Sequence, residues 1–80
     1  MPRYFFDIDD GENMHLDADG TEFPNEQAAR EGAALTIAEM GREVIPHDGG
    51  RRDLYIWIRD QSGTAVAKLS LNFKDRPFKR

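Results

Sequence analysis

The stretch DLYIWIRD, residues 53–60, decides the fold. Aliphatic side chains occupy its even positions, and aromatic or charged side chains occupy its odd ones. Successive side chains of a β-strand point to opposite faces, so this alternation predicts a strand with one face in the core and one outside. The two sets are Leu54, Ile56 and Ile58 on the core face, and Tyr55, Trp57 and Arg59 on the other.

Three further strands are predicted around this one. A hairpin loop at 61–64 leads into an alternating strand at 65–73. Near the start of the chain, the aromatic and β-branched residues at 4–8 favour a strand, and a shorter strand is predicted at 14–17. The segment between them, 9–13, contains Asp and Gly, which tolerate the backbone angles of a tight turn. The chain therefore contains two predicted hairpins.

A single helix is predicted between the hairpins. It begins near Pro24 and Asn25, where the Asn25 side chain can accept an unpaired amide hydrogen of the first turn. Apolar residues then recur at helical spacing, which predicts one buried stripe. Gly41 and Pro46 set its C-terminal limit, because proline cannot continue the helical hydrogen bonds. The stripe consists of Ala29, Ala33, Ile37, Met40 and Val44.

The expected fold class is α+β in the order β-β-α-β-β. Its four-stranded, mainly antiparallel sheet carries the helix on one face, and the single domain spans 1–73 with a basic C-terminal tail at 74–80. One helix covers one face, so the other face is expected to be open. The residues predicted to face the helix are Tyr4, Phe6, Ile8, Met14, Leu16, Leu54, Ile56, Ile58, Leu69 and Leu71.

Composition narrows the class of protein. The 80 residues, 39% hydrophobic and 32% charged, suit one small globular domain rather than a disordered chain. The absence of cysteine excludes a disulfide scaffold and a cysteine nucleophile, and favours a reducing cytoplasm. No apolar run is long enough for a membrane span, and the start does not resemble a signal peptide. We therefore expect a cytoplasmic protein without a membrane partner.

Charge is unevenly distributed along the chain. Residues 4–29 contain eight acidic residues and no Lys or Arg, whereas residues 51–80 contain eight basic residues against three acidic ones. The net charge of −4 disfavours general nucleic-acid affinity through the field of the whole molecule. Such asymmetry allows pairing within the fold, between two copies, or with a partner.

The open face carries the candidate binding residues. Strand alternation also places His15, Val66, Arg3 and Asp7 on this face, beside these candidate residues. Aromatic and arginine side chains dominate binding hot spots, and an exposed aromatic set marks a contact surface. The occupant expected first is a protein, either an unidentified partner or a second copy; stacked single-stranded nucleic acid comes second, and a tail folded back over the face is the remaining alternative. The candidate residues are Phe5, Tyr55, Trp57, Arg59 and Lys68.

Several segments together resemble a family of small domains of unknown function that occurs in alphaproteobacteria. They span nearly the whole chain, and the opening heptapeptide is the most specific of them. The resemblance implies a bacterial cytoplasmic protein, and no activity, ligand or catalytic residue. A looser likeness, over the first half, is to the N-terminal domain of HicB-type antitoxins, with an Asp-Gly turn between strands and a helix rich in Glu and Ala. The segments are Met1–Asp7, Asp19–Pro24, Ala28–Arg30 and Ile58–Gly63.

Motifs for chemistry are weak. The acidic segments Asp7–Gly11 and Asp17–Thr21 do not match a calcium loop and are better explained as turns. His15 and His47 have no cysteine beside them for a zinc site. Ser62 lies in a hairpin loop without the glycine spacing of a nucleophile elbow. We therefore expect a non-enzymatic protein with no metal or cofactor.

Overall fold

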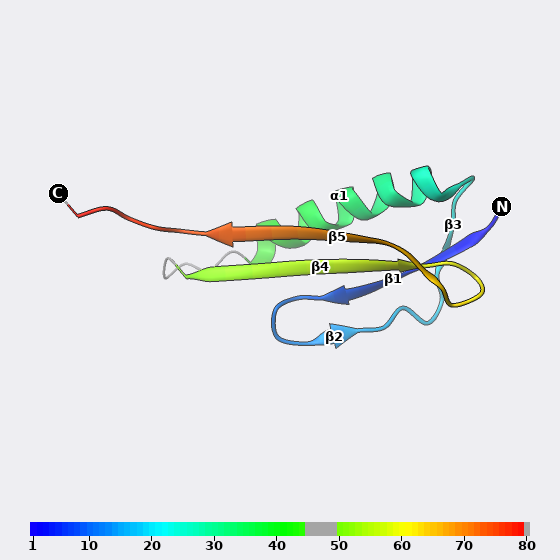
Figure 1. Cartoon of the computed structure of the whole chain (residues 1–80), viewed down its shortest axis with the longest axis horizontal. Coiled ribbons are helices and arrows are strands. Elements are labelled where there is room, and N and C mark those ends of the chain that lie inside the picture. Colours follow the sequence, from blue (N-terminus) through cyan, green and yellow to red (C-terminus); the bar gives the residue numbers. More distant parts are fainter. Residues whose placement is uncertain (45–49, 80) are drawn as a thin grey trace.

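The computed structural model describes residues 1–44 and 50–79. One helix and five strands build an elongated molecule of 55 × 22 × 18 Å, with the C-terminal residues running away from the body (Figure 1). The predicted helix limit at Pro46, as well as His47 and Arg80, lies outside the described residues. The elements are β1 (Arg3–Asp9), β2 (Met14–His15), β3 (Thr21–Glu22), α1 (Glu26–Val44), β4 (Arg51–Arg59) and β5 (Ala65–Lys74).

The sheet has the strand order β2-β1-β4-β5, and every pairing between the described strands is antiparallel. The long strands β4 and β5 form one hairpin, while β1 inserts on the other side of β4 (Figure 1). The α+β class is confirmed, as are the single helix and the antiparallel sheet. The order is β-β-β-α-β-β rather than β-β-α-β-β, because Thr21 and Glu22 add a short strand against the start of β1.

The helix forms where the sequence predicts it. Asn25 caps α1, its Oδ1 accepting the Ala28 N–H at 2.8 Å. Ala29 and Ala33 are completely buried, and such small side chains let the helix backbone lie close to β4 and β5. Gly32 allows a second close approach, between α1 and the Phe23 ring, because a Cβ atom there would stand only 2.9 Å from that ring. The predicted stripe is buried at Ala29, Ala33 and Ile37, whereas Met40 and Val44 are only partly buried against the core.

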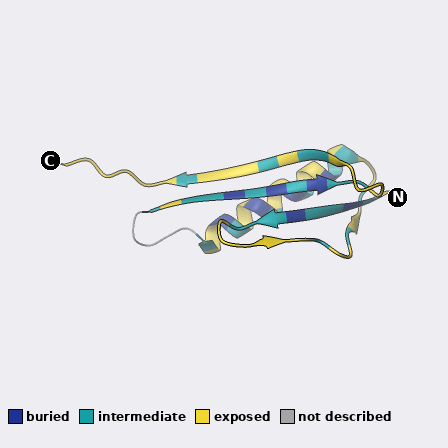
Figure 2. Ribbon diagram, turned by 60° about the horizontal axis from the view of Figure 1, so that its bottom comes forward, coloured by how far each residue is buried: buried dark blue, intermediate teal, exposed yellow. Residues whose placement is uncertain are grey.

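The core lies between α1 and the middle of the sheet. Leu54, Ile56 and Ile58 of β4 are at most 1% exposed, so the stretch that predicts the fold also supplies its best-buried side chains. Figure 2 shows the same gradient: buried segments lie along β4 and the inner side of α1, whereas β2 and much of β5 are exposed. Tyr4 is buried beside this core, with Phe6 packed against it.

The inward assignment of Met14 and Leu16 is wrong. Antiparallel partners share a face, and β2 pairs Met14 with Asp9 and His15 with Ile8. Met14 therefore lies on the open face and His15 on the helix side, the reverse of the prediction. A shift of one residue inverts every side chain of a strand, and a strand of only two residues has no long pattern to fix its register. Met14 is 51% exposed and Leu16 74% exposed.

A β-bulge accounts for the misplaced Val66. Ile58 pairs with Ala67, but Arg59 pairs with Ala65, which leaves Val66 as the extra residue. Strand alternation fails at that point, and Val66 packs against the core instead of lying on the open face. Leu71, also predicted to face inward, is in contact range of Gly41 on α1 yet remains 38% exposed, because β5 is at the margin of the sheet.

Candidate functional site

The strand registers define the open face of the sheet, the one opposite α1. Residues paired across antiparallel strands lie side by side on the same face, so the strand pairings give rows that run from β1 through β4 to β5. Polar side chains surround two aromatic ones in the middle. The rows are Phe5 and Arg59; Asp7, Trp57 and Lys68; Asp9, Tyr55 and Ser70; Asp53 and Asn72; and Arg51 and Lys74.

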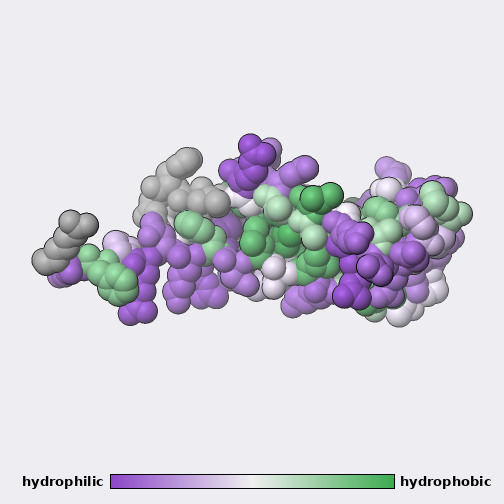
Figure 3. Space-filling view, turned by 90° about the horizontal axis from the view of Figure 1, so that it is seen from above, coloured by the Kyte–Doolittle hydropathy of each residue, from purple (hydrophilic) through white to green (hydrophobic). Residues whose placement is uncertain are grey.

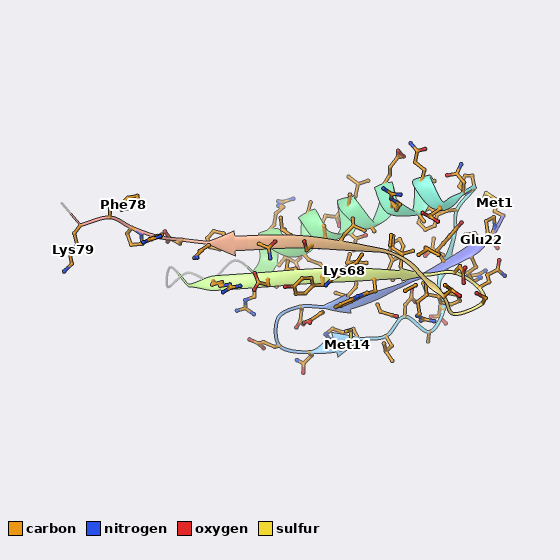
Figure 4. All side chains as sticks on the ribbon, viewed as in Figure 1. Met1, Met14, Glu22, Lys68, Phe78 and Lys79 are labelled. Atoms are coloured by element: carbon orange, nitrogen blue, oxygen red, sulfur yellow. The ribbon has the colours of Figure 1, made fainter. Side chains whose placement is uncertain are left out.

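Three side chains in the middle rows form what we call the aromatic patch: Tyr55, Trp57 and Lys68. The Tyr55 and Trp57 rings are 5.7 Å apart between centroids and are tilted by 38°. The Lys68 Nζ lies 4.7 Å from the Tyr55 centroid and 5.1 Å from that of Trp57, so one ammonium group contacts both ring systems. Both rings are partly exposed and Lys68 is exposed, above the middle of the sheet (Figure 4).

The other two candidate residues, Phe5 and Arg59, belong to a separate cluster of side chains at one end of the same face. Arg59 makes a two-pronged ion pair with Asp7, with Nε 2.6 Å from Oδ2 and Nη2 3.1 Å from Oδ1. The Arg59 guanidinium also lies 5.0 Å from the centroid of the Phe5 ring. Asp7 is only 7% exposed and the Arg59 side chain is 30% exposed, so this is a partly buried ion pair within the fold.

The turn at Asp17–Gly20 covers this ion pair. The Asp17 N–H donates to the Asp7 Oδ1 at 3.0 Å, and the Asp17 carbonyl accepts the Arg59 Nη2–H at 3.1 Å. Gly20 lies so close to the Phe5 ring that a Cβ atom there would be 2.8 Å from it. We call Phe5, Asp7, Arg59 and Asp17–Gly20 the covered end of the face.

The sequence predicts a single group of five binding residues, but in the structure they form two separate clusters. Tyr55, Trp57 and Lys68 are together and accessible, whereas Phe5 and Arg59 have their binding capacity occupied within the chain. The sequence contains a signal for the turn at Asp17–Gly20, since Asp-x-Asp-Gly favours local hydrogen bonds. It does not reveal that this turn crosses back over β1. That contact joins residues 42 positions apart, Asp17 and Arg59.

The charges at the covered end are mutually stabilised. Hydrogen bonds from the Arg59 guanidinium hold the pKa of Asp7 below its ordinary value of 3.8, outweighing the opposite effect of burial. Burial raises the pKa of Asp17, but the N–H groups of Gly20 and Phe6 lower it by more. Both carboxylates therefore stay ionised at neutral pH. Asp7 thus keeps its ion pair with Arg59, and Asp17 keeps the hydrogen bonds that it accepts from the N–H groups of Phe6 and Gly20.

Polar pairs border the aromatic patch on the side of the C-terminal tail. Asn72 donates to the Asp53 carboxylate at 2.8 Å, and Arg51 lies 3.0 Å from the same carboxyl group. Lys74 is opposite Arg51 in the register. The patch therefore has cations at this border as well as Lys68 at its centre, with Asp9 and Asp53 as nearby acids.

His15, the histidine among the described residues, pairs with an acid of the neighbouring turn. His15 Nε2 lies 3.1 Å from Asp10 Oδ2, at the β1–β2 turn. Hydrogen bonds from the backbone N–H groups of Asn13 and Glu12 lower the pKa of Asp10 to about 2, with a smaller contribution from His15. Among residues 1–44 and 50–79, no three potential ligands are grouped as a metal site needs.

Surface hydropathy shows a hydrophobic region at the middle of the molecule between hydrophilic ends, seen from above in Figure 3. Leu35 of α1 is 68% exposed, so it lies on the helix surface away from the core. In the described part of the chain, no helix has the length and hydrophobicity needed to cross a membrane.

Residues 3–72, which include the whole open face down to Asn72, match the family described as domain of unknown function DUF6894. The chain belongs to that family. Comparison with curated proteins and with solved structures gives no significant match.

Proposed function

We propose that this protein is a non-enzymatic interaction domain whose aromatic patch, Tyr55, Trp57 and Lys68, binds another protein. The observation that carries the proposal is the placement of the two rings. They lie on the face of the sheet that α1 leaves uncovered, with one shared ammonium group above them. The cytoplasm remains the expected compartment, because the chain contains no cysteine for disulfide stabilisation.

Aromatic side chains on a sheet surface support this function on energetic grounds. A small domain gains stability by burying its large apolar side chains, so a partly exposed tryptophan beside a tyrosine represents unused apolar area. Covering such area is the main source of affinity at protein interfaces, where Trp and Tyr are enriched among hot spots. The C-terminal tail does not cover the patch: Phe78 is 84% exposed and lies far from Lys68 (Figure 4).

The charges favour a protein over single-stranded nucleic acid. Nucleic-acid platforms offer free ring faces to the bases, but here the Lys68 Nζ lies about 5 Å from both ring centroids, at 4.7 and 5.1 Å. Asp9 and Asp53 border the patch, and the molecule carries a net charge of −4. The net negative charge of the whole molecule disfavours the approach of a phosphate backbone at long range.

The same charges indicate the kind of partner segment. An apolar side chain would cover Trp57 and Tyr55, while a carboxylate would approach Lys68, with Arg51 and Lys74 farther along the face. In the described chain Lys68 is the cation that contacts the rings. A partner segment therefore needs one acidic group to pair with Lys68 and one or two apolar groups to cover the rings. The expected partner segment is therefore a short stretch of another protein that contains both acidic and hydrophobic residues.

Affinity capture tests the proposal. The wild-type chain, Trp57→Ser and Leu35→Ser are immobilised and exposed to an alphaproteobacterial lysate, with and without nuclease. Leu35→Ser is the matched control, because it also removes an exposed hydrophobic side chain, on α1 instead of the open face. We expect a protein that wild type and Leu35→Ser retain and that Trp57→Ser loses. The purified protein should then bind wild type directly.

Three outcomes contradict the proposal. Retention by Trp57→Ser at the wild-type level would place the binding surface elsewhere. Loss of the captured protein after nuclease treatment would favour nucleic acid on the rings, and steep weakening with salt would accompany it. Capture of the chain's own second copy alone, lost in Trp57→Ser, would assign the patch to self-association.

A further inference from the structure

β5 forms one complete edge of the sheet. Its ten residues, Ala65–Lys74, pair with β4 on one side, from Ala65 opposite Arg59 to Lys74 opposite Arg51. On its other side no strand follows in the described chain, and α1 contacts the face of β5 rather than adding to the sheet. An edge of this kind presents a row of backbone N–H and C=O groups that can pair with another strand.

The two edges of the sheet differ in how well they are protected. At the opposite edge, β2 is only two residues long, which leaves little to pair with. β5 lacks two of the usual obstacles to pairing along its middle: it contains no proline, and its bulge is confined to the end at Val66. Its only charged residues are Lys68 and Lys74. Figure 2 shows most of this strand as exposed.

We propose that β5 is a dimerisation edge, on which the β5 strand of a second copy pairs antiparallel about a two-fold axis at Leu69. The two sheets then join into one, with both helices on the same side. This surface shares Lys68 with the aromatic patch but does not include the two rings, so the inference holds whether or not the rings bind another protein. Such an isologous contact closes on itself and gives a dimer instead of a fibre.

Charge and side-chain size favour this register over one with the axis at Leu71. With the axis at Leu69, Lys68 of each copy lies opposite the partner's Ser70, and the partly exposed Leu71 lies opposite the partner's small Ala67. A shift of the axis to Leu71 would place Lys68 directly opposite the partner's Lys74. Like charges at directly opposed positions of a sheet are destabilising. The chosen register avoids that pairing at both symmetric positions.

The C-terminal residues support the antiparallel direction. Residues 75–79 continue the line of β5 beyond the end of β4, and Phe78 and Lys79 extend away from the body (Figure 4). In the antiparallel dimer this segment runs beside the partner's hairpin loop at 60–64. The segment carries Arg76 and Lys79 against Asp75, a net charge of +1, whereas residues 60–67 carry Asp60 and no basic residue. A segment of net positive charge therefore meets a loop of net negative charge at both ends of the seam.

Ser70 provides the test, because it is exposed and lies opposite the partner's Lys68 only in this register. Sedimentation velocity over about 1–200 µM measures the mass of wild type, Ser70→Lys and Ser70→Glu. Wild type is expected to reach twice the chain mass of 9.1 kDa. Ser70→Lys creates two opposed cation pairs and should weaken the dimer about tenfold or more. Ser70→Glu creates two ion pairs instead and should dimerise at least as well as wild type.

Trp57→Ser separates this proposal from the function of the aromatic patch, since it should dimerise like wild type. Hydrogen exchange gives a second readout that needs no variant: protection of β5 amides should rise with wild-type concentration. A monomeric wild type over the whole range would overturn the proposal, as would dimers of Ser70→Lys that are as tight as wild type. Equal weakening by Ser70→Lys and Ser70→Glu would overturn the register, and loss of the dimer in Trp57→Ser would overturn the choice of surface.

Discussion

Arg59 on β4 reaches across to Asp7 on β1 and binds its carboxylate with two hydrogen bonds, of 2.6 and 3.1 Å. The two residues are not direct partners in the register: Asp7 pairs with Trp57, and Arg59 pairs with Phe5. The ion pair is therefore diagonal across the open face, immediately beside Trp57. It fixes one end of the face and leaves the aromatic patch as the accessible part.

Asp7→Asn should destabilise the fold by about 2 kcal/mol, the usual scale for losing hydrogen bonds to a charged group in a largely buried place. The substitution leaves the Arg59 charge without its carboxylate. Urea denaturation at pH 7 measures the change in the free energy of unfolding. Asp53→Asn serves as the control, because its carboxylate is also hydrogen-bonded but is accessible to solvent, and it should change stability little. Equal stability of Asp7→Asn and wild type would show that the pair contributes nothing.

Stability should fall as the pH drops below about 4. The pKa values of Asp7 and Asp17 are lowered in the fold, and that of Asp10 is lowered to about 2, from an ordinary value of 3.8. The unfolded chain therefore binds protons first as the pH falls, which shifts the equilibrium towards unfolding until the folded carboxylates also protonate. The stabilisation is complete above the unfolded pKa and is lost towards the folded pKa.

Urea midpoints between pH 7 and pH 2.5 measure this dependence. Asp10→Asn should keep the turn, because its side-chain oxygen can still accept the Glu12 and Asn13 N–H groups that Asp10 binds at 2.9 and 2.8 Å. It should also show a weaker dependence on pH than wild type. A wild-type midpoint at pH 3 equal to that at pH 7 would contradict the prediction.

Gly20→Ala should destabilise the fold more than Gly63→Ala. Both glycines have positive φ angles, +72° and +87°, so alanine at either position costs about 1 kcal/mol of backbone strain. Only Gly20 also packs against the Phe5 ring, where an added Cβ would overpack the covered end by a further 1–3 kcal/mol or so. Thermal unfolding of both variants gives the difference directly. Equal losses would mean that the turn is not held against Phe5.

Most of the architecture can be predicted from the sequence because its long elements carry long patterns. The stretch at 53–60 and the strand at 65–73 alternate over enough residues to fix their faces, and the helical stripe runs over four turns. Where patterns are short, prediction fails: Met14 and His15 are inverted in a two-residue strand, and Thr21–Glu22 form a strand too short to show any periodicity.

The candidate site was predictable in part for the same reason. Tyr55 and Trp57 follow from alternation in β4, and Lys68 follows from alternation in β5 beyond its bulge. Val66 does not, because a bulge depends on how two strands pair and leaves no periodic signal. The hydrogen bonds of Asp17 with Asp7 and Arg59 join distant segments, and local patterns do not encode such a contact.

The central claim is that Trp57 lies on a binding surface and not in the core, and the free energy of unfolding of Trp57→Ser tests it most directly. Urea denaturation followed by far-UV circular dichroism suits this variant, because Trp57 is the chain's only tryptophan. Ile56→Ser is the matched control, one residue away on the buried face of β4. We predict a loss below about 1.5 kcal/mol for Trp57→Ser, and about 3–5 kcal/mol for Ile56→Ser. A loss as large for Trp57→Ser as for Ile56→Ser would contradict the account and assign Trp57 to the core.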